Sequence, residues 1–231
     1  MTSIVVLAGE GEYSSDQTMK QYAADLGDAT VHYRTPDVLP DYPDFPPSTF
    51  GDLSVLRDAD LLVVYTRFRV LPDAEMAELA AYVERGGAVL GLRTSTHAFK
   101  FPDGSPWASW NDGFGRDVLG SPWVSHHGHS SSTDVTSVVS SDDPLVAGVP
   151  ERFTTRSWLY RVELSPGCRV LLHGEPIDPE DAPTPSPVAW VREGHNRVFF
   201  TSLGHPDDFA LPAFRRLLTN ATTWCLNGGR R

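Results

Sequence analysis

The sequence has few of the features that define several common classes of protein. It contains two cysteines, Cys168 and Cys225, which are far apart along the chain and make neither a disulfide framework nor a structural zinc site. A reducing cytoplasm is therefore the expected location. The 19 Lys and Arg residues against 30 Asp and Glu residues give a formal net charge of -11. Because clustered basic residues drive binding to nucleic acid and to anionic membranes, we expect neither as a partner.

Long apolar runs and the common nucleotide-binding motifs are also missing. No run approaches the length of a membrane span, and residues 1–11 predict a first strand rather than a secretion signal. Gly9 and Gly11 lack the third glycine and the downstream acidic residue of a dinucleotide-binding fingerprint. The chain also has no Walker motif and no G-x-S-x-G turn, which argues against a nucleotide-binding enzyme or a serine hydrolase.

The pattern that is present indicates an α/β fold. The 231 residues, of which 40% are hydrophobic, suffice for a sizeable core, and we expect one domain over residues 1–231. Short apolar runs at 4–7, 29–33, 61–65 and 88–92 predict strands. The order up to the last of these strands reads as β-α-β-α-β-α-β. This alternation predicts a doubly wound, mainly parallel sheet of the flavodoxin-like kind.

The rest of the chain has a more mixed pattern. Prolines break residues 35–50 into a predicted loop, and residues 100–132, rich in Gly, Ser, Trp and His, predict an insertion beside the site. Residues 134–192 have the composition of antiparallel strands and predict a β-rich insertion. A last strand at 197–202 and a closing helix from Pro212 complete the prediction.

Polar residues follow the predicted parallel strands at the points where these strands end. In open α/β sheets the ligand crevice lies outside the carboxyl ends of the strands, so these residues are expected to line one site. The candidates are Glu12, Tyr13, Arg67, Arg93, Thr94, His97, His205, Asp207 and Asp208.

The chemistry of these residues suggests specific roles. His97 and His205 are the predicted acid and base, because imidazole titrates near neutral pH. Asp207 or Asp208 is placed to orient His205, and Arg93 to polarise an oxygen atom of the ligand. The alternative for each histidine is a structural role, in which the ring satisfies backbone groups in a turn.

A histidine-rich segment and an aromatic residue offer further candidates. His126, His127 and His129 resemble a cluster of metal ligands, so a divalent metal is one option and no other cofactor is predicted. Adjacent histidines cannot easily aim at one ion, and a loop lining a polar pocket is the favoured interpretation, with His127 as a predicted substrate-binding residue of the same crevice. Trp123 offers a ring for stacking on a sugar face, although packing of the insertion explains it equally well.

Several segments spread over nearly the whole chain resemble the trehalose-utilisation, or ThuA-like, family of the class I glutamine amidotransferase-like superfamily. They read GEGEYSSDQTM, DADLLVVYTRFRVLPDAEM, GLRTSTHAF, FGRDVLGSPWVSHHG, PSPVAW, RVFFTSLGHPDDF and NATTW. The resemblance implies a role in the metabolism of trehalose or a related disaccharide, with oxidised (keto) sugars included. It also implies a sugar or sugar derivative as the partner, while a homo-oligomer stays open.

The superfamily pattern is only partly present. Class I glutaminases have a nucleophilic Cys after the central strand and a later His-Pro-Glu, which His205-Pro206-Asp207 resembles with Asp in place of Glu. Arg93 or Thr94 occupies or adjoins the nucleophile position, so thioester chemistry is not expected. A ThuA-like protein that acts on or binds a sugar is the leading hypothesis. The alternatives are a catalytically inert binding module, a metal-dependent hydrolase and a residual amidotransferase.

Overall fold

The computed structural model describes residues 1–38, 46–128, 132–177 and 184–228. One large sheet contains the strands β1 (Ser3–Gly9), β2 (Thr30–Arg34), β3 (Leu61–Thr66), β4 (Ala88–Leu92), β6 (Thr133–Ser137), β7 (Arg152–Thr155), β9 (Cys168–Pro176), β10 (Ser186–Glu193) and β11 (Arg197–Thr201). A short separate pair joins β5 (Ser125–His126) to β8 (Tyr160–Arg161). The helices are α1 (Ser15–Ala24), α2 (Asp73–Glu84), α3 (Trp110–Gly113) and α4 (Pro212–Leu226).

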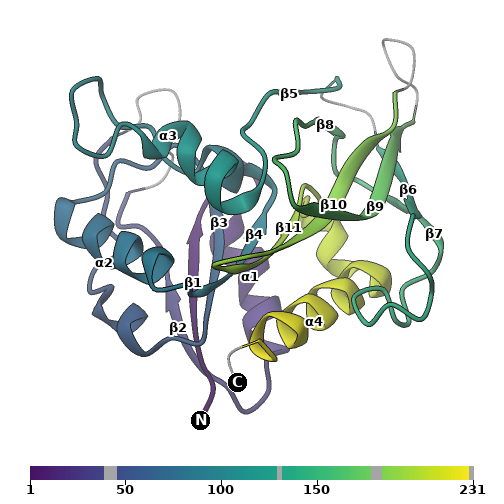
Figure 1. Ribbon diagram of the computed structural model, residues 1–231, viewed down its shortest axis with the longest axis horizontal. Coiled ribbons are helices and arrows are strands. Elements are labelled where there is room, and N and C mark those ends of the chain that lie inside the picture. Colours follow the sequence, from purple (N-terminus) through teal and green to yellow (C-terminus); the bar gives the residue numbers. More distant parts are fainter. Residues whose placement is uncertain (39–45, 129–131, 178–183, 229–231) are drawn as a thin grey trace.

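The strand order of the large sheet is β2-β1-β3-β4-β11-β10-β9-β6-β7 among the described residues. The first five strands in this order are parallel, and the remaining strands pair antiparallel. The predicted mainly parallel, doubly wound sheet is therefore confirmed, and its β-rich part continues the same sheet (Figure 1). None of the described helices is long and apolar enough to span a membrane.

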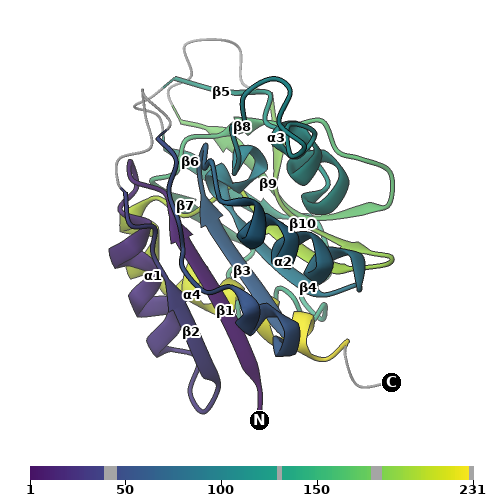
Figure 2. The same cartoon turned by 90° about the vertical axis from the view of Figure 1, so that its left-hand side faces the viewer.

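Helices cover both faces of the parallel strands. Successive residues of a strand point to opposite faces of the sheet, so each face has its own apolar side chains to bury. Val5 and Leu7 of β1 belong to the hydrophobic cluster that contains the buried side of α2. Ile4 and Val6 belong to the cluster that contains residues of α1 and α4. Figure 2 shows α1 and α4 on one side of the strands and α2 and α3 on the other. Every residue of β3 is buried, which explains its continuous apolar sequence.

Two connections differ from the sequence-based expectation. The link between β2 and β3 contains a 3-10 helix, Ser54–Asp58, where the predicted alternation implies an α-helix. The aromatic-rich insertion contains α3, which continues as a π-helical segment, Phe114–Leu119. Its aromatic residues pack as a cluster, with Trp110 and Phe114 stacked and both edge-on to Phe99. This packing depends on tertiary contacts, so helical periodicity did not reveal the segment.

Candidate functional site

A tight 3-10 turn, Arg93–His97, follows β4 at the carboxyl edge of the sheet, and all five of its residues are buried. Arg93 has a backbone φ of 44°, a left-handed conformation that is unusual for a residue other than glycine. Thr94 donates a hydrogen bond to the carbonyl oxygen of Thr66 at 3.0 Å. The Ser95 hydroxyl lies 2.7 Å from the carbonyl oxygen of Val64. These hydroxyls hold the turn against β3, and the ligand contact of Thr94 stays a prediction.

The guanidinium of Arg93 lies among aromatic rings. Its carbon atom Cζ lies 4.2 Å from the ring centre of Tyr13, 5.1 Å from Tyr160 and 5.6 Å from Trp158. One terminal nitrogen donates to the carbonyl oxygen of Ser202 and the other to the Tyr13 hydroxyl, each at 3.0 Å. Because arginine stays protonated in proteins, this group is a permanent buried cation, and no carboxylate contacts it within the described chain.

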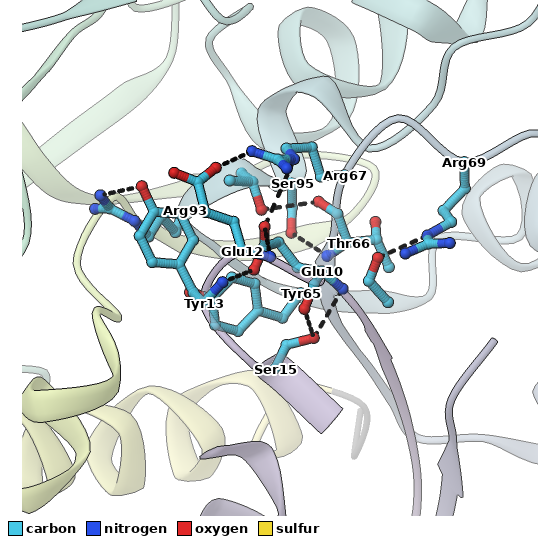
Figure 3. Close-up of polar contacts among 12 residues, drawn as sticks. Glu10, Glu12, Tyr13, Ser15, Tyr65, Thr66, Arg67, Arg69, Arg93 and Ser95 are labelled. Atoms are coloured by element: carbon cyan, nitrogen blue, oxygen red, sulfur yellow. Dashed lines mark hydrogen bonds and ion pairs between the residues drawn. The ribbon is translucent and has the colours of Figure 1, made fainter. Parts of the chain in front are cut away.

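The loop after β1 is organised by a buried acid, Glu10, that the sequence analysis did not single out. Its carboxylate accepts the backbone N–H of Glu12 at 2.9 Å and that of Tyr13 at 2.5 Å (Figure 3). The same carboxylate lies 3.5 Å from Nε of Arg67, which also forms an ion pair with Glu12. Glu12, Tyr13 and Arg67 are thus brought together as the edge position predicts. The sequence signal for Glu10 was its position as an acidic residue directly after the strand β1.

His205 begins a short 3-10 helix, Pro206–Ala210, and its ring acts as the cap. Nδ1 accepts the backbone N–H of Asp207 at 3.2 Å, so the neutral imidazole carries its proton on Nε2. The Asp207 carboxylate is 3.6 Å from Nδ1 and its side chain is 74% exposed. The backbone of Asp207, and not its carboxylate, therefore orients the ring. Burial lowers the pKa of His205 although Asp207 and Asp208 oppose this shift, which favours the neutral ring near pH 7.

Asp208 is fully buried beneath the same turn. Its carboxylate accepts the Ser157 hydroxyl at 2.6 Å and the backbone N–H of Arg156 at 2.8 Å. It also accepts the backbone N–H groups of Gly204 at 3.1 Å and His205 at 3.2 Å. These bonds hold the turn that carries His205, and the ligand contact of Asp208 stays a prediction.

His97 lies at the other end of the candidate site. Its ring packs between Phe68, at 4.9 Å, and Trp123, at 5.2 Å between ring centres. Burial, with the charges of Arg67 and Arg93, lowers the pKa of His97 to about 3, so this ring is neutral near pH 7. An acid role near neutral pH, which its sequence position suggested, requires the protonated form that burial disfavours.

A row of aromatic rings separates the two histidines. Neither a hydrogen bond nor a ring contact joins His97 to His205 in the described structure. The rings between them, in order from His97, are Trp123, His126, Trp158 and Tyr13. The structure therefore places both histidines at one edge of the sheet without making them an acid–base pair in contact. Trp158 was missed because it approaches Arg93 only through tertiary folding.

The histidine-rich segment shows no metal site in its described part. Nδ1 of His126 lies 2.8 Å from the carbonyl oxygen of His127, which makes Nδ1 the donor and leaves Nε2 as an acceptor. His127 is buried, and its backbone N–H donates to Leu159. His129 lies outside the described residues. No group of three His, Cys, Asp or Glu side chains that could hold a metal occurs among the residues that are described, so the metal stays a prediction.

Neither cysteine lies at the position of a glutaminase nucleophile. Cys168 begins β9, where its Sγ lies 3.6 Å from the carbonyl oxygen of Gly120. Cys225 is buried in α4, and burial raises the pKa of its thiol to about 12. Because a thiolate is the reactive form of cysteine, this shift disfavours a nucleophilic role for Cys225.

A cavity of about 750 Å³ lies elsewhere, between α1 and α4. Its lining includes Tyr22, Leu26, Leu218 and Thr222, and it reaches residues at the amino ends of β1 and β2. The aromatic and charged residues around Arg93 are not part of this lining. Size alone does not make it the functional site, because the chemically capable side chains gather at the carboxyl edge of the sheet.

The parallel sheet, the tight turn after β4 and the His205-Pro206-Asp207 turn together define an α/β protein with a class I glutamine amidotransferase-like fold. A family model described as trehalose utilisation, ThuA, matches residues 10–225. The chain therefore belongs to the ThuA family. A comparison with curated proteins gives no match.

Solved structures with a similar fold include a ThuA-like protein, a cytoplasmic protein and PurLQS. A ThuA-like protein from Parabacteroides merdae has a TM-score of 0.67 at 16% identity, covering 98% of this chain and 90% of the other. A cytoplasmic protein from Salmonella typhimurium has a TM-score of 0.58 at 12% identity, covering 97% and 98%. PurLQS from Thermotoga maritima has a TM-score of 0.52 at 14% identity, covering 100% and 99%. At these identities the likeness shows the fold alone.

Proposed function

We propose that this protein binds trehalose or a related sugar at the carboxyl edge of the sheet and transforms it without a cysteine nucleophile. The observation that carries this proposal is the buried guanidinium of Arg93 in the turn after β4, which donates a hydrogen bond to the Tyr13 hydroxyl. The resemblance to class I glutaminases puts Arg93 or Thr94 at or next to the position of their nucleophile. A cation behind a hydroxyl suits polarisation of a ligand oxygen and does not suit thioester formation. The family relationship supports the choice of a carbohydrate.

Aromatic side chains around this edge support sugar binding. Trp123 is 41% exposed, and its ring contacts the rings of His97 and His126. An exposed indole at a site rich in hydrogen-bonding groups can stack on the apolar face of a pyranose ring. Arg67 and Glu12, which pair with each other, supply donors and acceptors for sugar hydroxyls beside it. The two free cysteines fit a cytoplasmic location.

Trp123→Ala is expected to weaken binding of trehalose about tenfold, because the stacking surface is lost while the buried network stays intact. Isothermal titration calorimetry of the wild-type and Trp123→Ala proteins with trehalose, sucrose and gluconate measures this effect. Trp224→Ala is the control, because Trp224 stacks on Arg197 beside α4, away from the site. The proposal is wrong if none of the three sugars binds the wild-type protein.

A second candidate is a binding module without turnover, and the loss of the nucleophile at Arg93 favours it. Proton NMR of trehalose incubated with the protein separates the two candidates, since an enzyme changes the sugar signals and a binding module does not.

A metal-dependent variant of the proposal uses His126, His127 and His129. Elemental analysis of untagged protein tests this variant, and less than stoichiometric metal counts against it.

A further inference from the structure

The Tyr13 hydroxyl accepts a hydrogen bond from Arg93 and can also donate one. Arginine has no lone pair, so the 3.0 Å contact between Arg93 and Tyr13 requires the tyrosine oxygen to accept. The O–H group of Tyr13 is then available as a donor, and its proton has no acceptor among the residues that the structure describes. Burial raises the pKa of Tyr13 although Arg93 opposes the shift, so the hydroxyl keeps this proton at neutral pH.

The position of Tyr13 is fixed from several sides. Glu10 accepts its backbone N–H at 2.5 Å, and the ring lies over the Arg93 guanidinium (Figure 3). The ring also makes edge contacts with Trp158 at 5.9 Å and with His205 at 6.1 Å between centres. A hydroxyl held this firmly loses little conformational entropy when it binds a ligand, which favours a binding role.

His205 supplies a second donor beside Tyr13. Its Nδ1 is occupied by the backbone N–H of Asp207, so Nε2 carries the proton of the neutral ring. The His205 side chain is 22% exposed, so a ligand can reach it from solvent. Arg93 adds a permanent positive charge behind both groups.

We infer that the Tyr13 hydroxyl and Nε2–H of His205 form a donor pair that binds one negatively polarised oxygen of the ligand, a carbonyl or a carboxylate oxygen. This inference rests on the proposed sugar-binding function and names the chemical class of sugar. Two neutral donors backed by a cation stabilise negative charge on oxygen, whereas a hydroxyl group gains less from the same arrangement. Arg67, the neighbouring cation, is instead paired with Glu10 and Glu12.

Three glucose derivatives test the inference by calorimetry. Gluconate presents a carboxylate, glucono-1,5-lactam presents a stable carbonyl, and methyl α-glucoside presents neither. We expect at least one of the first two to bind the wild-type protein ten or more times more tightly than methyl α-glucoside. Binding of gluconate would indicate recognition of a carboxylate, and binding of the lactam would indicate recognition of a carbonyl group.

Matched variants assign the effect to the donor pair. Tyr13→Phe keeps the ring over Arg93 and removes the hydroxyl. His205→Asn keeps an acceptor near the Nδ1 position and removes the Nε2 donor. Each of these variants should abolish the tenfold preference. His205→Gln, which retains a donor near Nε2, should keep part of it. Tyr33→Phe is the control, because that hydroxyl bonds to backbone carbonyls at the start of α1. Melting curves verify that each variant is folded.

The outcomes separate the inference from the proposed function. Equal binding of all three derivatives, or a preference that survives in Tyr13→Phe, overturns the donor pair and leaves sugar binding intact. A wild-type protein that binds none of these derivatives and no trehalose overturns both.

Discussion

Three arginines near the carboxyl edge of the sheet show how differently one residue type can be used. Arg67 is paired with the carboxylates of Glu10 and Glu12. Arg69 donates to the backbone carbonyl oxygens of Gly9 and Val38 at 2.7 Å each, which ties the loop after β3 to neighbouring segments. Arg93 instead contacts aromatic rings and a tyrosine hydroxyl. The contrast singles out Arg93 as the cation with charge available to act on a ligand.

The buried ring of His97 predicts how the stability of the protein depends on pH. Its pKa of about 3 in the folded protein lies below the ordinary value of about 6.5, so the folded state favours the neutral ring. The resulting stability is present above pH 6.5 and is lost as the pH falls below it. Between pH 7 and pH 5 the loss is roughly 2 kcal/mol. His97→Gln should remove this part of the pH dependence in urea unfolding.

The control for that prediction is the same comparison between pH 7 and pH 8, which lies above the ordinary pKa of histidine. Over that interval wild-type protein and His97→Gln should show the same change in unfolding free energy. An equal dependence between pH 7 and pH 5 in wild-type protein and His97→Gln would show that the buried ring does not titrate as the structure implies.

The residue-level predictions from sequence succeeded where a strand end determines position. Glu12, Tyr13, Arg67 and Arg93 gather at one edge because parallel strands deliver them there. The tautomer of His205 could not be predicted, since it depends on one backbone hydrogen bond. Trp158, Tyr160 and Ser157 come from the β-rich part of the chain, and only their tertiary placement brings them to Arg93 and Asp208.

At the scale of elements, the helical segment from α3 to Leu119 supports the Arg93 turn. Gly115 lies so close to this turn that an added Cβ would sit 2.3 Å from the carbonyl oxygen of Thr96 and 2.8 Å from that of Ser121. Both neighbours are backbone atoms and cannot move as a flexible side chain would. The Arg93 turn is therefore held from one side by β3 and from the other by this helix.

Gly115→Ala is expected to destabilise the protein by about 2 to 4 kcal/mol, because the new methyl group collides with backbone. Gly113→Ala is the matched control in the same helix, where the nearest atom is a side-chain oxygen of Asp117 at 3.4 Å. That change should be neutral or slightly stabilising. Urea unfolding of both variants measures the difference, and similar effects would argue against close packing of the helix on the turn.

The elements themselves were only partly predictable. Apolar runs located β1, β3, β4 and β11 because strands covered on both faces need continuous hydrophobic sequence. The link before β3 and the helix in the aromatic-rich insertion were not found. The structure of the insertion depends on packing of Phe99, Trp110 and Phe114, which carries no simple sequence period.

At the scale of the whole molecule, a single sheet edge collects the chemistry while the large cavity lies elsewhere. The edge joins three loops, which follow β1, β4 and β11, through Tyr13, Arg93 and the His205 turn. The cavity between α1 and α4 is lined mostly by apolar residues and threonines. The net charge of -11 gives no general attraction for anions, so any preference for a negatively polarised ligand must arise locally at Arg93.

A crystal structure of the protein soaked with gluconate and, separately, with trehalose would show where the ligand binds. We expect ligand density at the carboxyl edge of the sheet, with an oxygen atom within hydrogen-bonding distance of the Tyr13 hydroxyl and Nε2 of His205. Density confined to the cavity between α1 and α4, with the residues around Arg93 untouched, would contradict it.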